Sequence, residues 1–335
     1  MKKTVLLSYI ALFLAFALPW LSLRQDRQLP ESPPEPVQTA APLPETTPPE
    51  APVYKAKEAP ELMEVLNGRQ TEQTSLQEYL VGVVAAEMPA SFHPEALKAQ
   101  AVAARSYAIY TSRTGKHPEG QVCTDHKCCQ AWSSSRELEE KWGDNYSLYL
   151  EKIRSAVEET EGEYLCWQGE AIFAAFHSSS AGFTEDSGSL WAPLPYLVSV
   201  ESPENAEHVP NYISSLSLSP LDFRDTLLHA RPEADFTGEE STWIGPIRRD
   251  ASGRVESAVL GGVELKGTEL RSLFSLRSTA FTLEYREGLF VFTVSGYGHG
   301  VGMSQYGANV MAQQGAAYRD ILAHYYPGTE LVGAG

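Results

Sequence analysis

Basic residues are scarce in this chain of 335 residues. Lysine and arginine number 26 against 43 aspartates and glutamates, which gives a formal net charge of −17. A protein that binds nucleic acid presents a stripe of basic side chains to the phosphates. The acidic balance therefore argues against a nucleic-acid partner.

Signatures of several enzyme classes are missing as well. The chain has no HExxH sequence, the helical pattern that holds zinc in a large group of metallohydrolases. A glycine-rich segment near the carboxyl terminus lacks the Walker lysine and the dinucleotide spacing, so it does not predict a phosphate-binding loop. No internal repeat is visible. A zinc amidase and a nucleotide-dependent enzyme are thus disfavoured.

Only one apolar run is long enough to concern a membrane. Residues 5–23 are almost entirely apolar, and Lys2 and Lys3 precede them. At about 1.5 Å per residue, such a run can just cross a hydrocarbon core of about 30 Å. The preceding positive charge predicts a cytoplasmic amino terminus and an exported remainder. A signal peptide cleaved near Ala17 is the alternative, but apolar residues continue well past that site, so we favour a retained single-pass anchor over residues 1–24.

A proline-rich segment follows the anchor. Ten prolines lie between Pro30 and Pro60, mixed with Glu, Thr, Ala and Gln. This composition cannot bury a hydrophobic core, so residues 25–60 predict an extended tether, with a partner-binding site as the alternative. Residues 61–335 suffice for one large or two small domains.

Residues 75–110 predict two consecutive helices and a candidate catalytic acid. Ser75 followed by Glu78 is typical of a capping box, and apolar residues then recur at helical spacing until Pro89 ends the helix. Glu87 falls on the apolar face in the last turn, beside the negative end of the helix dipole. Burial and the dipole both penalise the ionised form, so we expect the raised pKa that a general acid requires. A solvated glutamate at a frayed helix end is the alternative.

The second helix begins at Pro94, which suits a first helical position, and its many alanines allow close packing against the first helix. Arg105 is the one cation in the run from Ala99 to Tyr110. It is a candidate partner for a substrate hydroxyl or a nearby carboxylate. A surface ion pair is the alternative.

Three of the four cysteines lie close together. In an exported chain the default for cysteine is a disulfide, but a bridge between adjacent Cys128 and Cys129 would be strained, and a bridge from Cys123 to either leaves one thiol unpaired. Three thiolates and an imidazole instead form a closed tetrahedral site, the usual form of structural zinc. The candidate ligands are then His117, Cys123, Cys128 and Cys129, with His126 as the competitor for His117. The spacing by itself leaves zinc and a disulfide both open.

A polar loop is a candidate for lining a ligand groove. It follows a β-prone segment and contains His177 and the hydroxyls of Ser178, Ser179 and Ser180, which can hydrogen-bond hydroxyls of a ligand. An ordinary turn with a solvated histidine is the alternative. Tyr196 is a candidate for stacking on a ring of the ligand, with a position in the core as its alternative.

Short β-like runs alternate with turns near the carboxyl terminus and predict a small inserted β-rich subdomain at about residues 242–292. A strand then enters a loop with four glycines, which allow the backbone to approach a ligand or the Glu87 helix closely. His299 in this loop is a candidate for supporting the acid or holding substrate, against a buried structural imidazole. Gln305 is a weaker candidate. The chain thus predicts an α+β fold, a helix pair packed with antiparallel β segments behind a membrane anchor.

Four stretches resemble the stage II sporulation protein D family of membrane-anchored lytic transglycosylases. They are the helix pair at 75–110, FHSSSAGFTED at 176–186, LRSTAF at 276–281 and SGYGHGVGMSQYGA at 295–308. They span nearly all of the chain beyond the tether, and the last is the most specific.

The resemblance implies an enzyme that cuts the bond between N-acetylmuramic acid and N-acetylglucosamine in peptidoglycan, preferably in strands stripped of stem peptides. Glu87 lies where the family has its catalytic acid. It would protonate the bridging oxygen and then take the proton from the muramic sugar's own primary hydroxyl, which closes an anhydro ring. Some members carry a metal-binding His/Cys cluster after the second helix, which favours structural zinc over a disulfide here.

The resemblance further implies septal peptidoglycan remodelling during engulfment, outside the cytoplasmic membrane and beside stage II sporulation proteins P and M. One carboxylate suffices for this reaction, whereas an ordinary glycosidase needs two. Glu185 and Asp186 are the nearby candidates for a second carboxylate. A hydrolytic muramidase and a non-catalytic glycan-binding scaffold are the alternatives.

Overall fold

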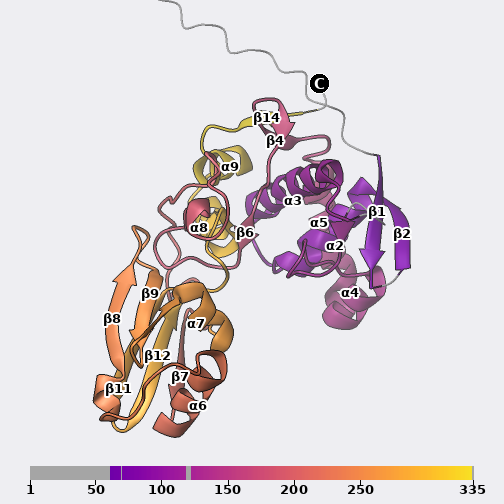
Figure 1. The fold of residues 1–335 in the computed structure, drawn as a ribbon. Coiled ribbons are helices and arrows are strands. Elements are labelled where there is room, and N and C mark those ends of the chain that lie inside the picture. The colour runs from indigo at the N-terminus through magenta and orange to yellow at the C-terminus, as the bar shows by residue number, and fades with distance from the viewer. Residues whose placement is uncertain (1–60, 69, 118–121, 334–335) are drawn as a thin grey trace, which may run out of the picture. The chain divides into compact units, whose positions relative to one another are not determined.

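The computed structural model describes residues 61–68, 70–117 and 122–333. The predicted anchor and tether, residues 1–60, lie outside this part of the chain. No helix within it is long and apolar enough to cross a membrane. The described chain forms a mixed α+β fold with several small sheets (Figure 1).

Two helices form the centre of the larger hydrophobic core. Helix α2 spans Leu76–Glu87 and α3 spans Pro94–Thr114, which confirms the predicted helix pair. Ser75 caps α2 by accepting a hydrogen bond from the Glu78 amide at 3.1 Å. Pro94 occupies the first turn of α3, where its missing N–H has no intrahelical partner to lose.

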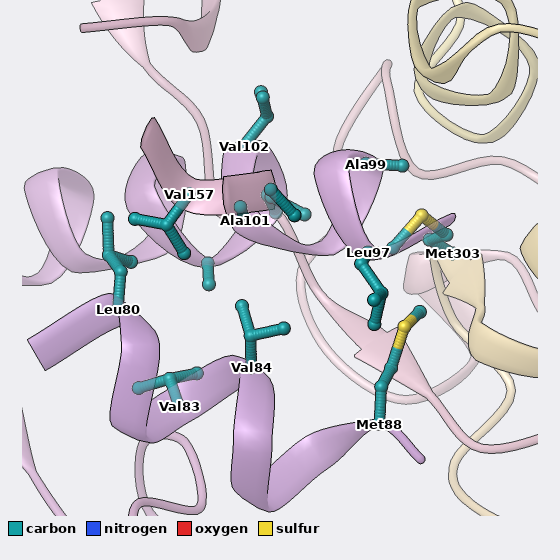
Figure 2. Packing of buried hydrophobic residues seen from close by; sticks show 14 of the residues in the cluster. Leu80, Val83, Val84, Met88, Leu97, Ala99, Ala101, Val102, Val157 and Met303 are labelled. Atoms are coloured by element: carbon teal, nitrogen blue, oxygen red, sulfur yellow. The ribbon is translucent and has the colours of Figure 1, made fainter. Parts of the chain in front are cut away.

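The alanines of α3 allow α2 to pack closely against it. Figure 2 shows Leu80 and Val84 of α2 lying against α3 and against Val157 of α5 (Tyr146–Glu158). All three side chains are fully buried. Burying such an aliphatic side chain contributes about 1.5–3 kcal/mol, so this contact fixes the end of α2 on which Glu87 sits.

Short strands flank the helix pair. β1 (Leu62–Asn67) pairs antiparallel with β2 (Gln70–Ser75) and parallel with β3 (Val122–Cys123). Helix α4 (Ser135–Trp142) precedes α5 and begins with a capping box at Ser134.

A short hairpin follows α5. β4 (Tyr164–Trp167) and β5 (Glu170–Ala171) pair antiparallel through Gln168 and Gly169, whose φ angles are 51° and 79°. Positive φ at both central residues is what a type I′ turn requires. β14 (Glu330–Val332) pairs with the other edge of β4.

The carboxyl-terminal elements return to the helix pair. β6 (Phe176–His177) pairs parallel with β13 (Met303–Ser304), and α8 (Gln305–Gln313) follows β13 directly. Helix α9 spans Tyr318–Tyr325. This pairing brings the polar loop after β6 next to the glycine-rich loop before β13.

A second hydrophobic core belongs to the β-rich subdomain. One antiparallel sheet has the order β11 (Phe281–Arg286), β12 (Leu289–Ser295) and β7 (Ile213–Leu218). Helix α6 (Pro220–Ala230) packs Phe223 onto this sheet, and its ring stacks on that of Phe290 at 3.9 Å.

The second sheet of the subdomain contains β8 (Ile244–Arg249), β9 (Val255–Leu260) and β10 (Val263–Lys266). Helix α7 (Gly267–Leu273) follows β10. The subdomain therefore begins near residue 213 rather than at the predicted 242. Strand β7 could not be predicted from the sequence, because it is serine-rich and none of its residues is fully buried.

Candidate active site

Glu87 is the last residue of α2, and two donors hold its carboxylate. The Ala131 amide donates to Oε1 at 2.8 Å, and the Gln305 side-chain amide donates to Oε2 at 3.2 Å. Burial raises the pKa of Glu87, whereas the two hydrogen bonds and nearby His126 act in the opposite direction and are outweighed. The structure therefore agrees with the raised pKa that the sequence predicts.

Glu87 lines a cleft with a volume of about 910 Å³. Aromatic rings, imidazoles and the loop that contains Cys128 and Cys129 form most of its walls. Glu87 is the only carboxylate among the described residues that line it. Its lining includes Tyr107, Phe173, Phe176, His177, Ser178, Trp191, Arg271, Tyr297, His299 and Gln305.

A second hollow, of about 440 Å³, also has Glu87 in its wall. Trp142 and Tyr149 line it, together with Lys141. Glu87 thus lines both hollows. A chain-like ligand that occupied both would place one of its bonds at Glu87.

The two histidines of the predicted site lie together in the larger cleft, with ring centroids 5.7 Å apart. His177 Nδ1 lies 3.2 Å from the Val301 carbonyl, so this nitrogen carries the proton, and Nε2 accepts from the Ser180 hydroxyl at 2.7 Å. Burial lowers the pKa of His177 well below its ordinary value. The ring is a neutral structural support of the loop.

His299 is also neutral at neutral pH. Its Nδ1 accepts a hydrogen bond from the Val301 amide at 3.1 Å, and burial together with the charge of Arg271 lowers its pKa to about 4. Trp191 packs against its ring at 5.2 Å between centroids. With Nδ1 as the acceptor, Nε2 carries the proton and donates to the Phe176 carbonyl, so the neutral ring brings no charge to the cleft.

Several predicted binding residues do not line the cleft. Ser179, Ser180 and Tyr196 are buried, and Tyr196 accepts a hydrogen bond from the Phe173 amide inside the core. The structure thus assigns Tyr196 the core position that was the alternative. Ser178 remains half-buried in the cleft wall.

Arg105 is 1% exposed, which corrects its assignment to the substrate site. Its guanidinium donates to the backbone carbonyls of Glu163 at 2.8 Å and Val157 at 3.2 Å. It therefore ties α3 to the end of α5. The alternative of a surface ion pair is also wrong, because Arg105 is buried and its hydrogen-bond partners include backbone carbonyls. The sequence could not predict this, since nothing near a single cation in an alanine-rich helix indicates which carbonyls will pack against it.

Glu204, which no sequence pattern marks as functional, is 2% exposed. It accepts hydrogen bonds from the Ser180 amide at 2.6 Å and from the Ser304 hydroxyl. Ser304 also caps α8, the helix whose first residue is Gln305. Glu204 thus fixes the helix start that directs Gln305 at Glu87. No local pattern around Glu204 distinguishes it from the other acidic residues of a polar stretch.

The predicted metal ligands come together in space. One ligand atom from each of His117, Cys123, Cys128 and Cys129 lies within 4.8 Å of all the others, and His117 Nε2 lies 3.2 Å from Cys129 Sγ. The sulfurs of a tetrahedral zinc site lie about 3.8 Å apart, so the donor set and its spacing fit such an ion. His126 is exposed and lies outside the cluster, which settles that choice for His117.

The cluster loop leads directly to the acid. Cys128 and Cys129 line the same cleft as Glu87, and Ala131, two residues further on, donates to its carboxylate. All four cysteines of the chain are free thiols in the structure, and Cys166 is buried in a small apolar cluster with Tyr164. The cluster is therefore placed to position Glu87.

Neither candidate for a second carboxylate lines the cleft. Glu185 is 3% exposed and lies 3.7 Å from Arg254 of the β-rich subdomain. Asp186 instead caps a short helical turn by accepting from the Gly188 amide. In the part of the chain that the structure describes, Glu87 therefore has no acidic partner in the cleft.

The glycine-rich loop approaches the polar loop rather than the Glu87 helix. Gly298 has a φ angle of 118°, and a Cβ built there would lie 2.7 Å from the Cβ of His177. At Gly302 a Cβ would lie 2.0 Å from the Ala175 carbonyl oxygen. Glycine is required because two backbones meet at these points.

The fold and the site together define an α+β protein with one carboxylic acid in a large cleft and a His/Cys cluster beside it. The profile of the stage II sporulation protein family (SpoIID) matches residues 67–167, which hold both the acid and the cluster. The chain belongs to the stage II sporulation protein D family.

Curated relatives support this assignment over most of the chain. Stage II sporulation protein D of Bacillus amyloliquefaciens is 36% identical over 297 residues, covering 87% of this chain and 81% of that protein. The protein of the same name from Bacillus subtilis is 38% identical, over 78% of this chain and 75% of its own length. A Bacillus subtilis protein named amidase enhancer is 29% identical over 75% of this chain, but over only 40% of its own length.

Proposed function

We propose that the chain is a lytic transglycosylase that cleaves peptidoglycan glycan strands between N-acetylmuramic acid and N-acetylglucosamine. The observation that carries the proposal is Glu87, a partly buried acid with a raised pKa and no second carboxylate among the described residues of its cleft. Hydrolysis with two carboxylates does not fit this arrangement, because the described lining of the cleft offers no second carboxylate to activate water.

In the proposed reaction, protonated Glu87 donates its proton to the bridging oxygen as the bond from the muramic C1 breaks. The muramic sugar's primary hydroxyl oxygen then bonds to C1, and the Glu87 carboxylate takes the hydroxyl proton. Atoms balance without water, and the acid ends in the form in which it began. The Ala131 and Gln305 amides hold the carboxylate in place through both halves.

Sugar rings have aromatic surfaces to contact on both sides of the acid. Trp191 and Tyr297 line the larger cleft and are 43% and 48% exposed, and Trp142 and Tyr149 line the smaller hollow. Ser178 provides a hydroxyl for sugar hydroxyls, and the His299 ring lines the same cleft. We propose that these residues, rather than Ser179, Ser180 or Tyr196, bind the strand.

We propose that the cluster of His117 and three cysteines holds structural zinc. Four protein ligands leave the ion no open position, so zinc when bound would supply a cross-link and no Lewis-acid chemistry. The cross-link would fix the loop whose Ala131 amide holds Glu87. The role is therefore to position the acid.

A digestion of purified, peptide-free glycan strands tests the activity. Wild-type protein should release fragments with anhydro ends, which are one water lighter than hydrolysis products, and Glu87→Gln should reduce the rate at least a thousandfold. Glu139→Gln, an exposed change on α4, is the matched control and should leave the rate unchanged. Fragments with reducing ends would make the protein a muramidase instead.

A second candidate function is stimulation of a peptidoglycan amidase without glycan cleavage. The similarity to a protein named amidase enhancer favours it. If this function holds, Glu87→Gln should increase the activity of a purified cell-wall amidase as much as the wild-type protein does. The cleavage and stimulation assays together separate the two candidates.

For location, we propose a single-pass anchor at residues 1–24 with the domain on the extracytoplasmic face, at the septal and engulfing membrane. Stage II sporulation proteins P and M are the proposed partners, because the family assignment implies engulfment. The full chain should pellet with membranes after salt extraction, whereas a chain that begins at residue 61 should not. Co-purification of the two partners from sporulating cells tests the association.

A further inference from the structure

The charge of the larger cleft runs opposite to that of the whole chain. The chain has a net charge of −17, yet Glu87 is the sole carboxylate among the described residues that line this cleft. Two cations, Lys127 and Arg271, lie in the same wall. A cleft of this kind favours a ligand that carries negative charge.

Arg271 is the cation whose charge is least compensated. It lies in the last turn of α7 and is half-buried, and its Nε donates to the Leu276 carbonyl at 3.3 Å. No carboxylate of a described residue forms an ion pair with it. Burial lowers the pKa of Arg271, and among the described residues the opposing influence comes from Tyr297 rather than from a carboxylate.

Some other arginines of the same subdomain have carboxylate partners, whereas Arg249 and Arg277 donate to backbone carbonyls. Arg231 contacts Glu269, which lies on α7 two positions before Arg271, and Arg248 lies 2.8 Å from Glu264. Lys127 is exposed, so water can solvate its charge. A partly desolvated guanidinium without an anion is unfavourable, and its planar donors match a carboxylate. Arg271 is therefore the group in the cleft that gains most from an anionic ligand.

The glycan offers one such anion close to the bond that is cut. N-acetylglucosamine is neutral, whereas the lactyl ether of N-acetylmuramic acid ends in a carboxyl group. That group is ionised when no peptide is attached, and it becomes a neutral amide when it carries a stem peptide. Only a peptide-free strand presents the charge next to the sugar ring.

We propose that Arg271 binds the free lactyl carboxylate of a muramic acid residue and thereby selects peptide-free strands. This inference rests on the proposed function, because it takes the glycan as the ligand of the cleft. The hydrogen bond to the Leu276 carbonyl uses only Nε, so the two terminal nitrogens of the guanidinium can donate to the carboxylate.

Binding measurements on the full-length chain in the Glu87→Gln background test the proposal without cleavage. Three ligands are compared: peptide-free strands, the same strands with lactyl carboxyls converted to methylamides, and strands with intact stem peptides. The Glu87→Gln protein should bind the first about tenfold more tightly than the other two. Adding Arg271→Gln should abolish that preference, and adding Arg271→Lys should restore part of it.

The matched control is Arg224→Gln, which removes the same charge from α6 of the subdomain and should keep the preference. A preference that survives Arg271→Gln overturns the inference. The inference is also overturned if Arg271→Gln weakens binding to peptide-bearing strands as much as it weakens binding to peptide-free strands. The anion that Arg271 binds would then belong to the peptide. Absence of anhydro ends from the wild-type protein would overturn the proposed catalysis alone, because the binding comparison does not depend on it.

Discussion

Glu87 shows how a single side chain is prepared for proton transfer in this chain. The helix that carries it is anchored by buried aliphatic residues, and burial then disfavours its ionised form. Two amide donors limit this effect and keep the carboxylate oriented. A residue that must give and then take a proton needs both influences.

Substituting Gln305 should change the pH dependence of the reaction. Its amide favours the ionised form of Glu87, so Gln305→Leu should raise the pKa of the acid further. The general acid acts only when protonated, so activity is lost as pH rises through this pKa. The alkaline limb of kcat/KM against pH should therefore move to higher pH, while the maximum rate falls about tenfold.

Gln313→Leu, at the exposed end of the same helix, is the control for this change. It should leave the profile in place. A limb that moves to lower pH in Gln305→Leu would contradict the role assigned to the amide.

The position of Glu87 could be predicted, but its partners could not. A cap at Ser75, helical periodicity and the stop at Pro89 fix which residue ends the helix, and all of these signals are local. The donors to its carboxylate come from 44 and 218 residues away, and no local pattern carries that information. Arg105 was misassigned for the same reason, since its partners are backbone carbonyls of another helix.

At the scale of elements, the loop of the His/Cys cluster links metal binding to the acid. If zinc holds this loop, the purified protein should contain about one equivalent of zinc, measured by atomic emission. Cys128→Ser should lose the metal and at least tenfold in activity, because the Ala131 amide is no longer held against Glu87.

Cys166→Ala, a change at a buried cysteine outside the cluster, should keep both zinc and activity. Full activity in a metal-free Cys128→Ser protein would show that the loop is positioned by its other contacts. One of these is the bond from the Tyr107 hydroxyl to the Cys128 carbonyl, at 3.2 Å.

The glycine-rich loop makes a prediction about stability. Gly298→Ala forces a side chain into a φ of 118° and a Cβ to within 2.7 Å of His177, so it should reduce the free energy of unfolding by at least 2 kcal/mol. Gly288→Ala, at a φ of 76° with open space around it, should cost about 1 kcal/mol. Urea unfolding of both variants measures the difference. Equal reductions in the free energy of unfolding would mean that His177 moves away from the added Cβ at no cost in stability.

At the scale of the whole described chain, the elements of two hydrophobic cores form one cleft. Helix α7 of the subdomain and helix α2 of the helix pair both line it, so the relative placement of the two cores determines the geometry of the site. The helix pair was predictable from periodicity. The start of the subdomain was not, because β7 is serine-rich and no residue of it is fully buried, so nothing marks it before its partner β12 is in place.

A buried ion pair joins the two cores. Arg254 of the subdomain and Glu185, which precedes it by 69 residues in the chain, have side chains that are 1% and 4% exposed, with Nε and Oε2 3.7 Å apart. Burial and repulsion from Asp250 raise the pKa of Glu185, and burial lowers that of Arg254. Both shifts oppose ionisation, so desolvation outweighs the attraction of the pair.

Breaking this pair from one side should be more harmful than removing it. Glu185→Gln leaves a buried guanidinium whose three nitrogens have no hydrogen-bond partner among the described residues, and it should reduce the free energy of unfolding by about 3 kcal/mol. Glu185→Leu combined with Arg254→Met removes both charges and should come within about 1 kcal/mol of the wild type. A double-mutant cycle by urea unfolding measures the coupling. If the single change proves as mild as the double one, water already solvates Arg254, and the two cores are joined by apolar contacts and backbone hydrogen bonds alone.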